Sequence, residues 1–289
     1  MTMTDEEREQ AGAGENTESL LPFGEHVEEV SENGKKVRHR GVYLLPNLFT
    51  TGALFGGFYA IIAAMDGSYA AAAIAIFIAM VLDGLDGRVA RLTNTSSAFG
   101  EQYDSLADMV SFGLAPALVM FSWALGDLGK IGWAAAFIYT ACAALRLARF
   151  NTQIGSVDKR YFIGLASPSA AAIIAGVVWI GSSAESDLLT AMAAAIITPL
   201  VGLLMVSNFR YSSFKGLDLR GRVPFVVMLA VVFVFVIVTL HPPLVLLTGF
   251  VLYGLSGPAV WTWRRRESIQ AGWQRWRARK NAAEADEDA

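Results

Sequence analysis

The chain has 289 residues, of which 54% are hydrophobic and only 17% are charged, and its mean hydropathy is +0.44. This composition excludes an ordinary soluble domain of this size and indicates a chain that lies mostly in lipid. The formal net charge of -3 is a poor guide to partners, because acidic residues crowd both tails while Lys and Arg flank the apolar segments. We expect membrane lipids as partners and no nucleic acid.

The first segment, 1–41, is polar and acidic and has no apolar core near its start, which argues against a cleavable secretory signal. We expect a cytoplasmic N-terminal segment that is disordered to about residue 23. Residues 24–41 allow a short surface helix. The first apolar window would then serve as the insertion signal.

Apolar windows of about 20 residues, the length that crosses a hydrocarbon core, follow one another through the middle of the chain. They cover about 42–64, 69–90, 101–125, 131–149, 164–181, 188–206, 223–240 and 244–263. The sequence therefore predicts an all-α, polytopic membrane helix bundle with about eight transmembrane helices. It forms a single membrane-embedded domain over 42–263.

Lys and Arg divide the connecting loops into two classes. They gather before the first window and after the second, fourth, sixth and eighth, whereas the alternate loops contain only Lys130. The positive-inside rule then puts both termini in the cytoplasm, as in a multi-pass protein of the bacterial cytoplasmic (inner) membrane. Residues 264–289 mix Trp with Arg before an acidic end, which predicts a basic amphipathic tail on an anionic leaflet.

Four aspartates stand where the second and third windows meet the predicted cytoplasmic face. Asp83 and Asp86 are about 60° apart around a helix, and Asp104 and Asp108 are about 40° apart, so each pair projects from one face. A short turn would bring the pairs together, and charge at this depth needs a partner. Oxygen-only ligation favours Mg²⁺, Mn²⁺ or Ca²⁺ over zinc, with room for two ions. The alternative is that these aspartates only cap helices and pair with neighbouring arginines.

Glycines and arginines accompany the aspartates. Gly84, Gly87 and Gly100 would let a bulky anion approach the backbone, and Arg88 and Arg91 supply positive charge. Divalent ions can neutralise phosphate oxygens while a carboxylate accepts a proton from an attacking hydroxyl, so this set favours phosphoryl transfer from a diphosphate at a membrane surface. A divalent-cation transporter would also use intramembrane aspartates, but it would not require the spacing of glycine and arginine.

The aspartates and the residues between them follow the pattern Asp83-x2-Asp86-Gly87-x2-Ala90-Arg91-x8-Gly100-x3-Asp104-x3-Asp108. At every position this pattern resembles the signature of the CDP-alcohol phosphotransferases, which transfer the phosphate-bearing part of a CDP-linked donor to an alcohol and release CMP. The resemblance implies that the four aspartates hold two divalent ions, Mg²⁺ or Mn²⁺, with Asp108 also the general base. It further implies a homodimer and a CDP pocket lined by Gly87, Ala90, Arg91 and Gly100.

Longer segments around the motif look like the bacterial membrane-integrated phosphatidylserine synthases. They begin at Leu45, Asp104, Ala144, Phe162 and Met205 and lie between about residues 40 and 220. This resemblance implies phosphatidyl transfer from CDP-diacylglycerol to the hydroxyl of L-serine, giving phosphatidylserine and CMP in phospholipid biosynthesis. Another acceptor, such as glycerol phosphate, inositol phosphate or choline, is the alternative within the same family.

Isolated polar residues near the motif suggest further contacts. Asn47 and Thr50 lie one turn apart in the first window, where they could hydrogen-bond the cytidine or its ribose, or tie helices together. Ser105 and Ser111 lie on the motif helix, where either could touch substrate or bond a backbone carbonyl. No histidine is a convincing acid or base, which leaves carboxylate chemistry.

The end of the fourth window carries Arg146, Arg149 and Asn151. Guanidinium groups bind carboxylates and phosphates through paired hydrogen bonds, so these residues could receive the serine carboxylate or the lipid phosphate. They are equally expected as ordinary markers of the cytoplasmic side.

Overall fold

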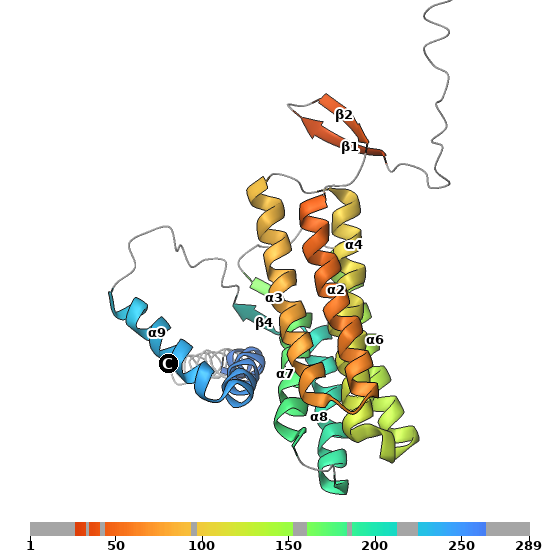
Figure 1. The fold of residues 1–289 in the computed structure, drawn as a ribbon, viewed down its shortest axis with the longest axis vertical. Coiled ribbons are helices and arrows are strands. Elements are labelled where there is room, and N and C mark those ends of the chain that lie inside the picture. Colours follow the sequence, from red (N-terminus) through yellow and green to blue (C-terminus); the bar gives the residue numbers. More distant parts are fainter. Residues whose placement is uncertain are drawn as a thin grey trace, which may run out of the picture.

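The computed structural model describes residues 27–32, 35–40, 44–93, 97–152, 161–183, 187–212 and 225–263. Over these residues the chain is a helix bundle with two short two-stranded sheets (Figure 1). The disordered segment expected up to residue 23 and the basic tail expected over 264–289 lie outside the described residues.

Long helices make up the body of the bundle. The uninterrupted α-helices among them are α2 (Leu44–Met65), α3 (Tyr69–Thr93), α6 (Lys130–Thr152), α7 (Ser167–Gly181), α8 (Leu188–Val206) and α9 (Phe225–Leu240). The third span is built from α4 (Ala98–Asp108), a π-helical turn η1 (Met109–Leu114), α5 (Ala115–Met120), a second π-helical turn η2 (Phe121–Leu125) and a 3-10 turn η3 (Gly126–Leu128). A last helix covers Pro242–Trp263.

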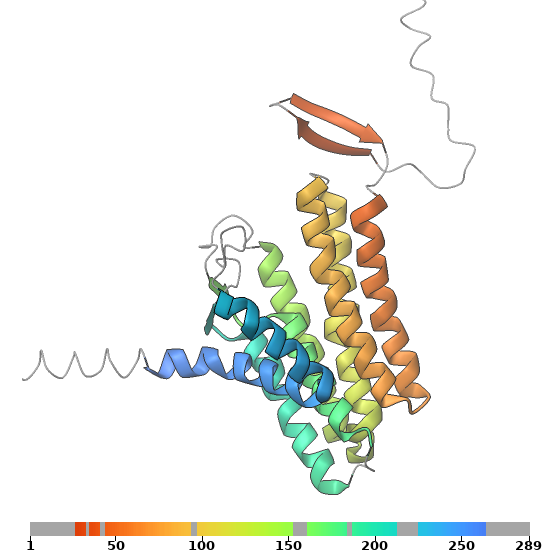
Figure 2. The same cartoon turned by 60° about the vertical axis from the view of Figure 1, so that its left-hand side comes forward.

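Six of the described helices are long and apolar enough to cross a membrane, which confirms the prediction of an all-α, multi-pass membrane bundle. They are Pro46–Met65, Tyr69–Thr93, Phe99–Leu128, Lys130–Thr152, Leu188–Val206 and Pro242–Trp263. The remaining two predicted windows hold shorter apolar helices, Ser167–Gly181 and Val226–Leu240. Figures 1 and 2 show α9 and the last helix at a steep angle to α2, α3 and α6. The cytoplasmic location of both termini stays a prediction.

The prediction of a surface helix over 24–41 is wrong. Within this segment, β1 (Val27–Glu32) and β2 (Lys35–Arg40) form a hairpin. The two residues between the strands are Asn-Gly, the dipeptide most favoured in two-residue hairpin turns. The antiparallel register also sets acidic positions opposite basic ones, with Glu29 facing Arg38 and Glu32 facing Lys35. The hairpin lies beyond the end of the bundle where α3 ends and α4 begins (Figures 1 and 2).

Helix α2 packs closely against α3 on one side and against the third span on the other. A Cβ added to Gly56 would lie 3.1 Å from that of Ala79, and one added to Gly57 would lie 2.6 Å from Ser111 Cα. Small residues at such contacts let helices approach in lipid, where burial alone drives no association. The hydroxyl of fully buried Ser111 donates to Ala53 O at 2.9 Å. Of the two interpretations of Ser111, this contact supports the one in which its hydroxyl bonds a backbone carbonyl.

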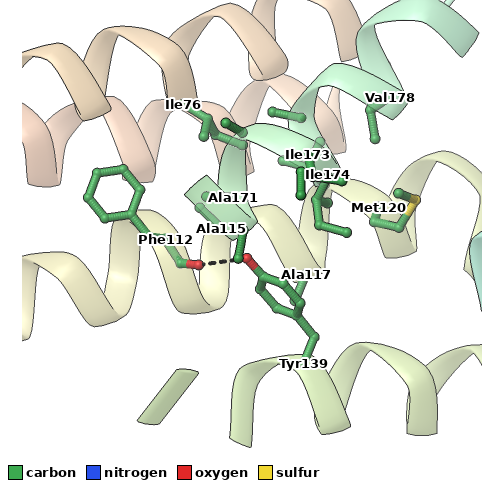
Figure 3. Close-up of a cluster of buried hydrophobic side chains, with 14 of the residues drawn as sticks. Ile76, Phe112, Ala115, Ala117, Met120, Tyr139, Ala171, Ile173, Ile174 and Val178 are labelled. Carbon is green, nitrogen blue, oxygen red and sulfur yellow. Dashed lines mark hydrogen bonds between the residues drawn. The ribbon is translucent and has the colours of Figure 1, made fainter. Parts of the chain in front are cut away.

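A proline interrupts the third span just beyond the aspartates. Pro116 has no N–H to donate to the carbonyl four residues earlier, which belongs to Phe112. The buried hydroxyl of Tyr139, on α6, donates to this carbonyl at 3.0 Å (Figure 3). Both side chains are fully buried in the main hydrophobic cluster. The contact therefore joins α6 to the third span one turn beyond Asp108.

A second pair of strands ties the bundle to the last helix. Strand β3 (Tyr161–Ile163) pairs with β4 (Arg210–Ser212), and Phe162 faces Tyr211. The fully buried Tyr211 donates from its hydroxyl to Gly254 O at 3.0 Å. A Cβ on Gly257 would lie 2.5 Å from the Tyr211 ring, so glycine is needed for the last helix to lie against it.

Candidate active site

The end of α3 and the start of α4 present the four aspartates of the motif. Asp83 and Asp86 lie in the last three turns of α3, whereas Asp104 and Asp108 lie one turn apart on α4. Ser97 caps α4, because its hydroxyl oxygen accepts the Gly100 N–H at 3.0 Å. The cap fixes where α4 begins and hence which of its faces carries the carboxylates.

The structure brings all four carboxylates together. Oxygen atoms of Asp83, Asp104 and Asp108 lie within 4.8 Å of one another. Across the two helices, Asp83 is within hydrogen-bonding reach of Asp108, and Asp86 is within reach of Asp104. Each aspartate of α3 therefore faces one of α4, as the helical phase predicts.

Carboxylates at this separation repel one another unless they are protonated or a cation lies between them. Six oxygens around Mg²⁺ at about 2.1 Å stand about 3 Å apart when adjacent and about 4 Å apart when opposite. The oxygen atoms of the acidic cluster lie within 4.8 Å of one another, so small side-chain movements would bring them to the spacing of ligands around one ion. Its donors are all carboxylate oxygens, which suit a hard divalent cation. The cluster is compatible with a divalent metal site.

Thr50 of α2 holds one of these carboxylates in place. Its hydroxyl donates to Asp86 Oδ2 at 2.9 Å, and both residues are buried, with 3% and 6% of their surfaces exposed. Of the two interpretations of Thr50, the structure therefore supports the one in which it ties helices together. A donor held in this way also fixes the orientation of the Asp86 carboxylate.

A pocket of about 210 Å³ opens beside Asp86 and Asp104, between the starts of α2 and α4 and the end of α3. Its lining includes all six residues expected to bind the CDP donor, namely Asn47, Thr50, Gly87, Ala90, Arg91 and Gly100. A Cβ on Gly87 would meet nothing within 4 Å, so glycine here leaves free space on the pocket side. The pocket also includes Pro46, Ser97 and Glu101, which the sequence did not single out.

Arg146 of α6 brings positive charge to the carboxylates. It lies close enough to Asp108 and Asp83 for their charges to interact. Its Nη1 donates to the buried hydroxyl of Ser167 at 2.6 Å, whereas its Nε is buried with no hydrogen-bond partner in the part of the chain that is described. Ser167, at the start of α7, has no local signal that would have identified it. A guanidinium fixed at one nitrogen and open at another is suited to bind an anion.

The other polar residues predicted near the acceptor connect helices around the cluster. Arg149 donates from Nη2 to Asn208 Oδ1 at 2.9 Å, just beyond the end of α8. Asn151 donates from Nδ2 to Ser105 Oγ at 3.1 Å and so links α6 to α4. These contacts bring the ends of α4, α6 and α8 to the same end of the bundle as the aspartates.

Comparison with known proteins places this site in a family. The family model described as CDP-alcohol phosphatidyltransferase matches residues 43–206, which run from α2 to α8. A CDP-diacylglycerol–serine O-phosphatidyltransferase from Helicobacter pylori is 38% identical over 198 residues, 68% of this chain and 83% of that protein. An archaetidylserine synthase from Methanothermobacter thermautotrophicus is 35% identical over 187 residues, 64% of this chain and 76% of that protein.

Among solved structures, a phosphatidylinositol phosphate synthase from Mycobacterium tuberculosis with CDP-DAG bound is 18% identical to this chain. The similarity covers 56% of this chain and 79% of that one, with a TM-score of 0.44. The family-model match includes the whole acidic cluster and the pocket beside it. The chain therefore belongs to the CDP-alcohol phosphatidyltransferase family.

Proposed function

We propose that this protein transfers the phosphatidyl group of CDP-diacylglycerol to the hydroxyl of L-serine, which yields phosphatidylserine and CMP. The observation that carries the proposal is the acidic cluster beside a pocket lined by all six residues of the expected donor site. The name of the H. pylori relative specifies serine as the acceptor, and that of the M. thermautotrophicus relative specifies a serine-containing product, which favours serine over other acceptors.

In this proposal the cytidine and diphosphate occupy the pocket beside Asp86 and Asp104. Arg91 supplies positive charge to the phosphates, and the open space at Gly87 lets them approach the backbone of α3. Asn47 lies across the pocket from α3, close to the start of α4, where it can hydrogen-bond the nucleoside. The acyl chains remain in the lipid around the bundle.

We assign the four aspartates to hold two divalent ions, Mg²⁺ or Mn²⁺. Such ions would supply charge neutralisation for the phosphate oxygens and for the departing CMP. Thr50 keeps Asp86 oriented through its hydrogen bond of 2.9 Å. The closeness of Asp83, Asp104 and Asp108, with Asp86 beside Asp104, supports a shared role of the four carboxylates in binding these ions.

The chemical step assigned to the protein is a proton transfer. Asp108 accepts the proton of the serine hydroxyl, the hydroxyl oxygen forms a bond to the phosphatidyl phosphorus, and the bond from phosphorus to the CMP oxygen breaks. Arg146 receives the serine carboxylate through its buried Nε, while Ser167 holds the guanidinium at Nη1. The acceptor would then lie beside Asp108, since Arg146 and Asp108 interact.

The positive-inside distribution supports a site that faces the cytoplasm in a bacterial cytoplasmic membrane. Serine then reaches Asp108 without crossing the lipid. A homodimer is part of the same proposal, and it rests on the family resemblance alone.

An acceptor screen on the purified protein tests the proposed reaction. Labelled CDP-diacylglycerol should release CMP with L-serine, and should not do so with glycerol phosphate, inositol phosphate or choline. Release with one of those acceptors instead would keep the reaction class and overturn the choice of serine. Divalent-cation flux into proteoliposomes without any CDP-linked lipid, and without CMP release, would overturn the enzyme proposal in favour of transport.

A further inference from the structure

Two adjoining hollows lie between α8 and the last helix, away from the acidic cluster. The larger one has a volume of about 670 Å³, within the range of about 300–1,000 Å³ typical of ligand pockets. Its walls are apolar side chains of α7, α8 and the last helix, with Ser207 as its one polar lining residue among those described. We call this hollow the apolar groove.

The smaller hollow, of about 290 Å³, lies at one end of the groove and has two polar side chains in its lining. Arg210, Asn208 and Trp261 line it. Phe209 belongs to the wall of the apolar groove, and its ring packs edge-on against Trp261 with 5.7 Å between centroids. On the last helix, Gly254 lines the groove and Gly257 lines the polar hollow less than one turn later. The two hollows therefore form one site with a polar head and an apolar body.

The depth of this site matches one leaflet of a bilayer. Its polar head is tied to the aspartate end of the bundle, because Arg149 hydrogen-bonds Asn208 at 2.9 Å. From Ser207 to Ile197 the groove follows α8 for ten residues, which is about 15 Å at 1.5 Å per residue. That is about half of a hydrocarbon core of about 30 Å.

We propose that this groove binds an anionic phospholipid of the surrounding leaflet, other than the donor, with its phosphate at Arg210 and one acyl chain along α8. Charge complementarity supports this occupant, since Arg210 lines the hollow together with Asn208, and Asn208 accepts a hydrogen bond from the guanidinium of Arg149. Basic pockets between helices at the interface are typical sites for such head groups.

The separation from the donor pocket also supports this assignment. No residue that lines the pocket beside Asp86 lines either hollow. Only 11% of an 18-residue stretch of the last helix is buried, so most of its surface has little protein contact among the described residues. A lipid in the groove would fill the space between it and α8 and hold it against the bundle.

Native mass spectrometry of the purified full-length protein tests the proposal. After partial delipidation and addition of phosphatidylglycerol or phosphatidylcholine, the wild-type chain should retain one phosphatidylglycerol in preference to phosphatidylcholine. Arg210→Gln should lower the retained fraction about tenfold, because it removes a charge-assisted bond to phosphate. Leu200→Trp, which fills the groove from an exposed α8 position, should also lower retention.

Two substitutions outside the groove serve as matched controls. Lys130→Gln removes a charge at the start of α6, and Leu189→Trp adds bulk at an exposed position of α8; both should retain lipid like the wild type. Equal retention of the two lipids, or equal loss in Arg210→Gln and Lys130→Gln, would overturn the proposal. Displacement by one equivalent of CDP-diacylglycerol would assign the groove to the donor instead. A disulfide between copies carrying Leu200→Cys would assign it to a second chain. Since no turnover is measured, these results are independent of the serine reaction.

Discussion

Replacing Thr50 by valine would test whether α2 positions a ligand of the metal. Valine keeps the branched shape of threonine and removes only the hydroxyl, which donates to Asp86 Oδ2 at 2.9 Å. A hydrogen bond to a charged group contributes about 1.5–3 kcal/mol, and each 1.4 kcal/mol is a factor of about ten in affinity. Since Thr50 is 3% exposed, water cannot readily replace the lost donor. We expect the metal affinity to fall about 10–100-fold, as for other partners of metal ligands.

The assay is the initial rate of CMP release at increasing Mg²⁺ or Mn²⁺, with CDP-diacylglycerol and serine held saturating. In Thr50→Val the metal concentration that gives the half-maximal rate should rise about 10–100-fold. The maximal rate should be recovered at a high metal concentration. Thr50→Ser keeps the hydroxyl and should behave like the wild type. An unchanged metal dependence in Thr50→Val would refute the reasoning. A higher KM for CDP-diacylglycerol alone would mean that Thr50 acts on the nucleotide.

Other predictions concern stability, measured by thermal unfolding of the protein in detergent. Tyr139→Phe should cost about 1–3 kcal/mol, because Phe112 O would lose its 3.0 Å hydrogen bond inside the core. Gly57→Ala should cost about 1–3 kcal/mol, since its Cβ would lie 2.6 Å from a backbone atom of the third span and α2 would have to move. Hydrogen bonds from Thr190 lower the pKa of Asp187 below its ordinary value of 3.8. This N-cap should therefore stabilise α8 above that pH and lose its effect as the pH falls through the lowered pKa.

Matched variants separate these causes from general damage. Gly84→Ala adds a methyl group where nothing lies within 4 Å and should not destabilise the fold. A similar unfolding temperature for Gly57→Ala and Gly84→Ala would contradict the close contact of α2. Asp187→Ala should unfold at a lower temperature than the wild type at pH 6, and the two should converge in strong acid. Asp187→Asn keeps a capping oxygen but has no titrating charge. If its unfolding temperature differed from that of Asp187→Ala with the same pH dependence as the wild type, another titrating group would be responsible.

Much of the fold follows from local composition. A helix crosses lipid only if about 20 successive residues are apolar. The position of each spanning helix can therefore be predicted from its own sequence, without knowing which helices pack against it. The meeting of Asp83 and Asp86 with Asp104 and Asp108 was also predictable, because helical phase and a short connection leave few other arrangements. The hairpin at Val27–Arg40 was missed although its Asn-Gly turn signal stands in the sequence.

The rest depends on contacts between distant positions, for which no local pattern exists. Thr50 and Asp86 are 36 residues apart, and Arg146 and Ser167 are 21 apart. Each residue alone is compatible with several partners, so the sequence left the role of Thr50 open and did not identify Ser167. Likewise, apolar length predicts that the last helix can enter a membrane, but the steep angle shown in Figure 2 depends on how it packs.

The most direct test of the central claim compares the wild type with Asp108→Asn, using labelled L-serine and CDP-diacylglycerol in the presence of Mg²⁺ or Mn²⁺. The wild type should form one phosphatidylserine for each CMP released. Asp108→Asn should form none while still binding CDP-diacylglycerol, because the donor pocket beside Asp86 and Asp104 does not include residue 108. Formation of phosphatidylserine at the wild-type rate by Asp108→Asn would contradict the assignment of the acidic cluster as the catalytic centre.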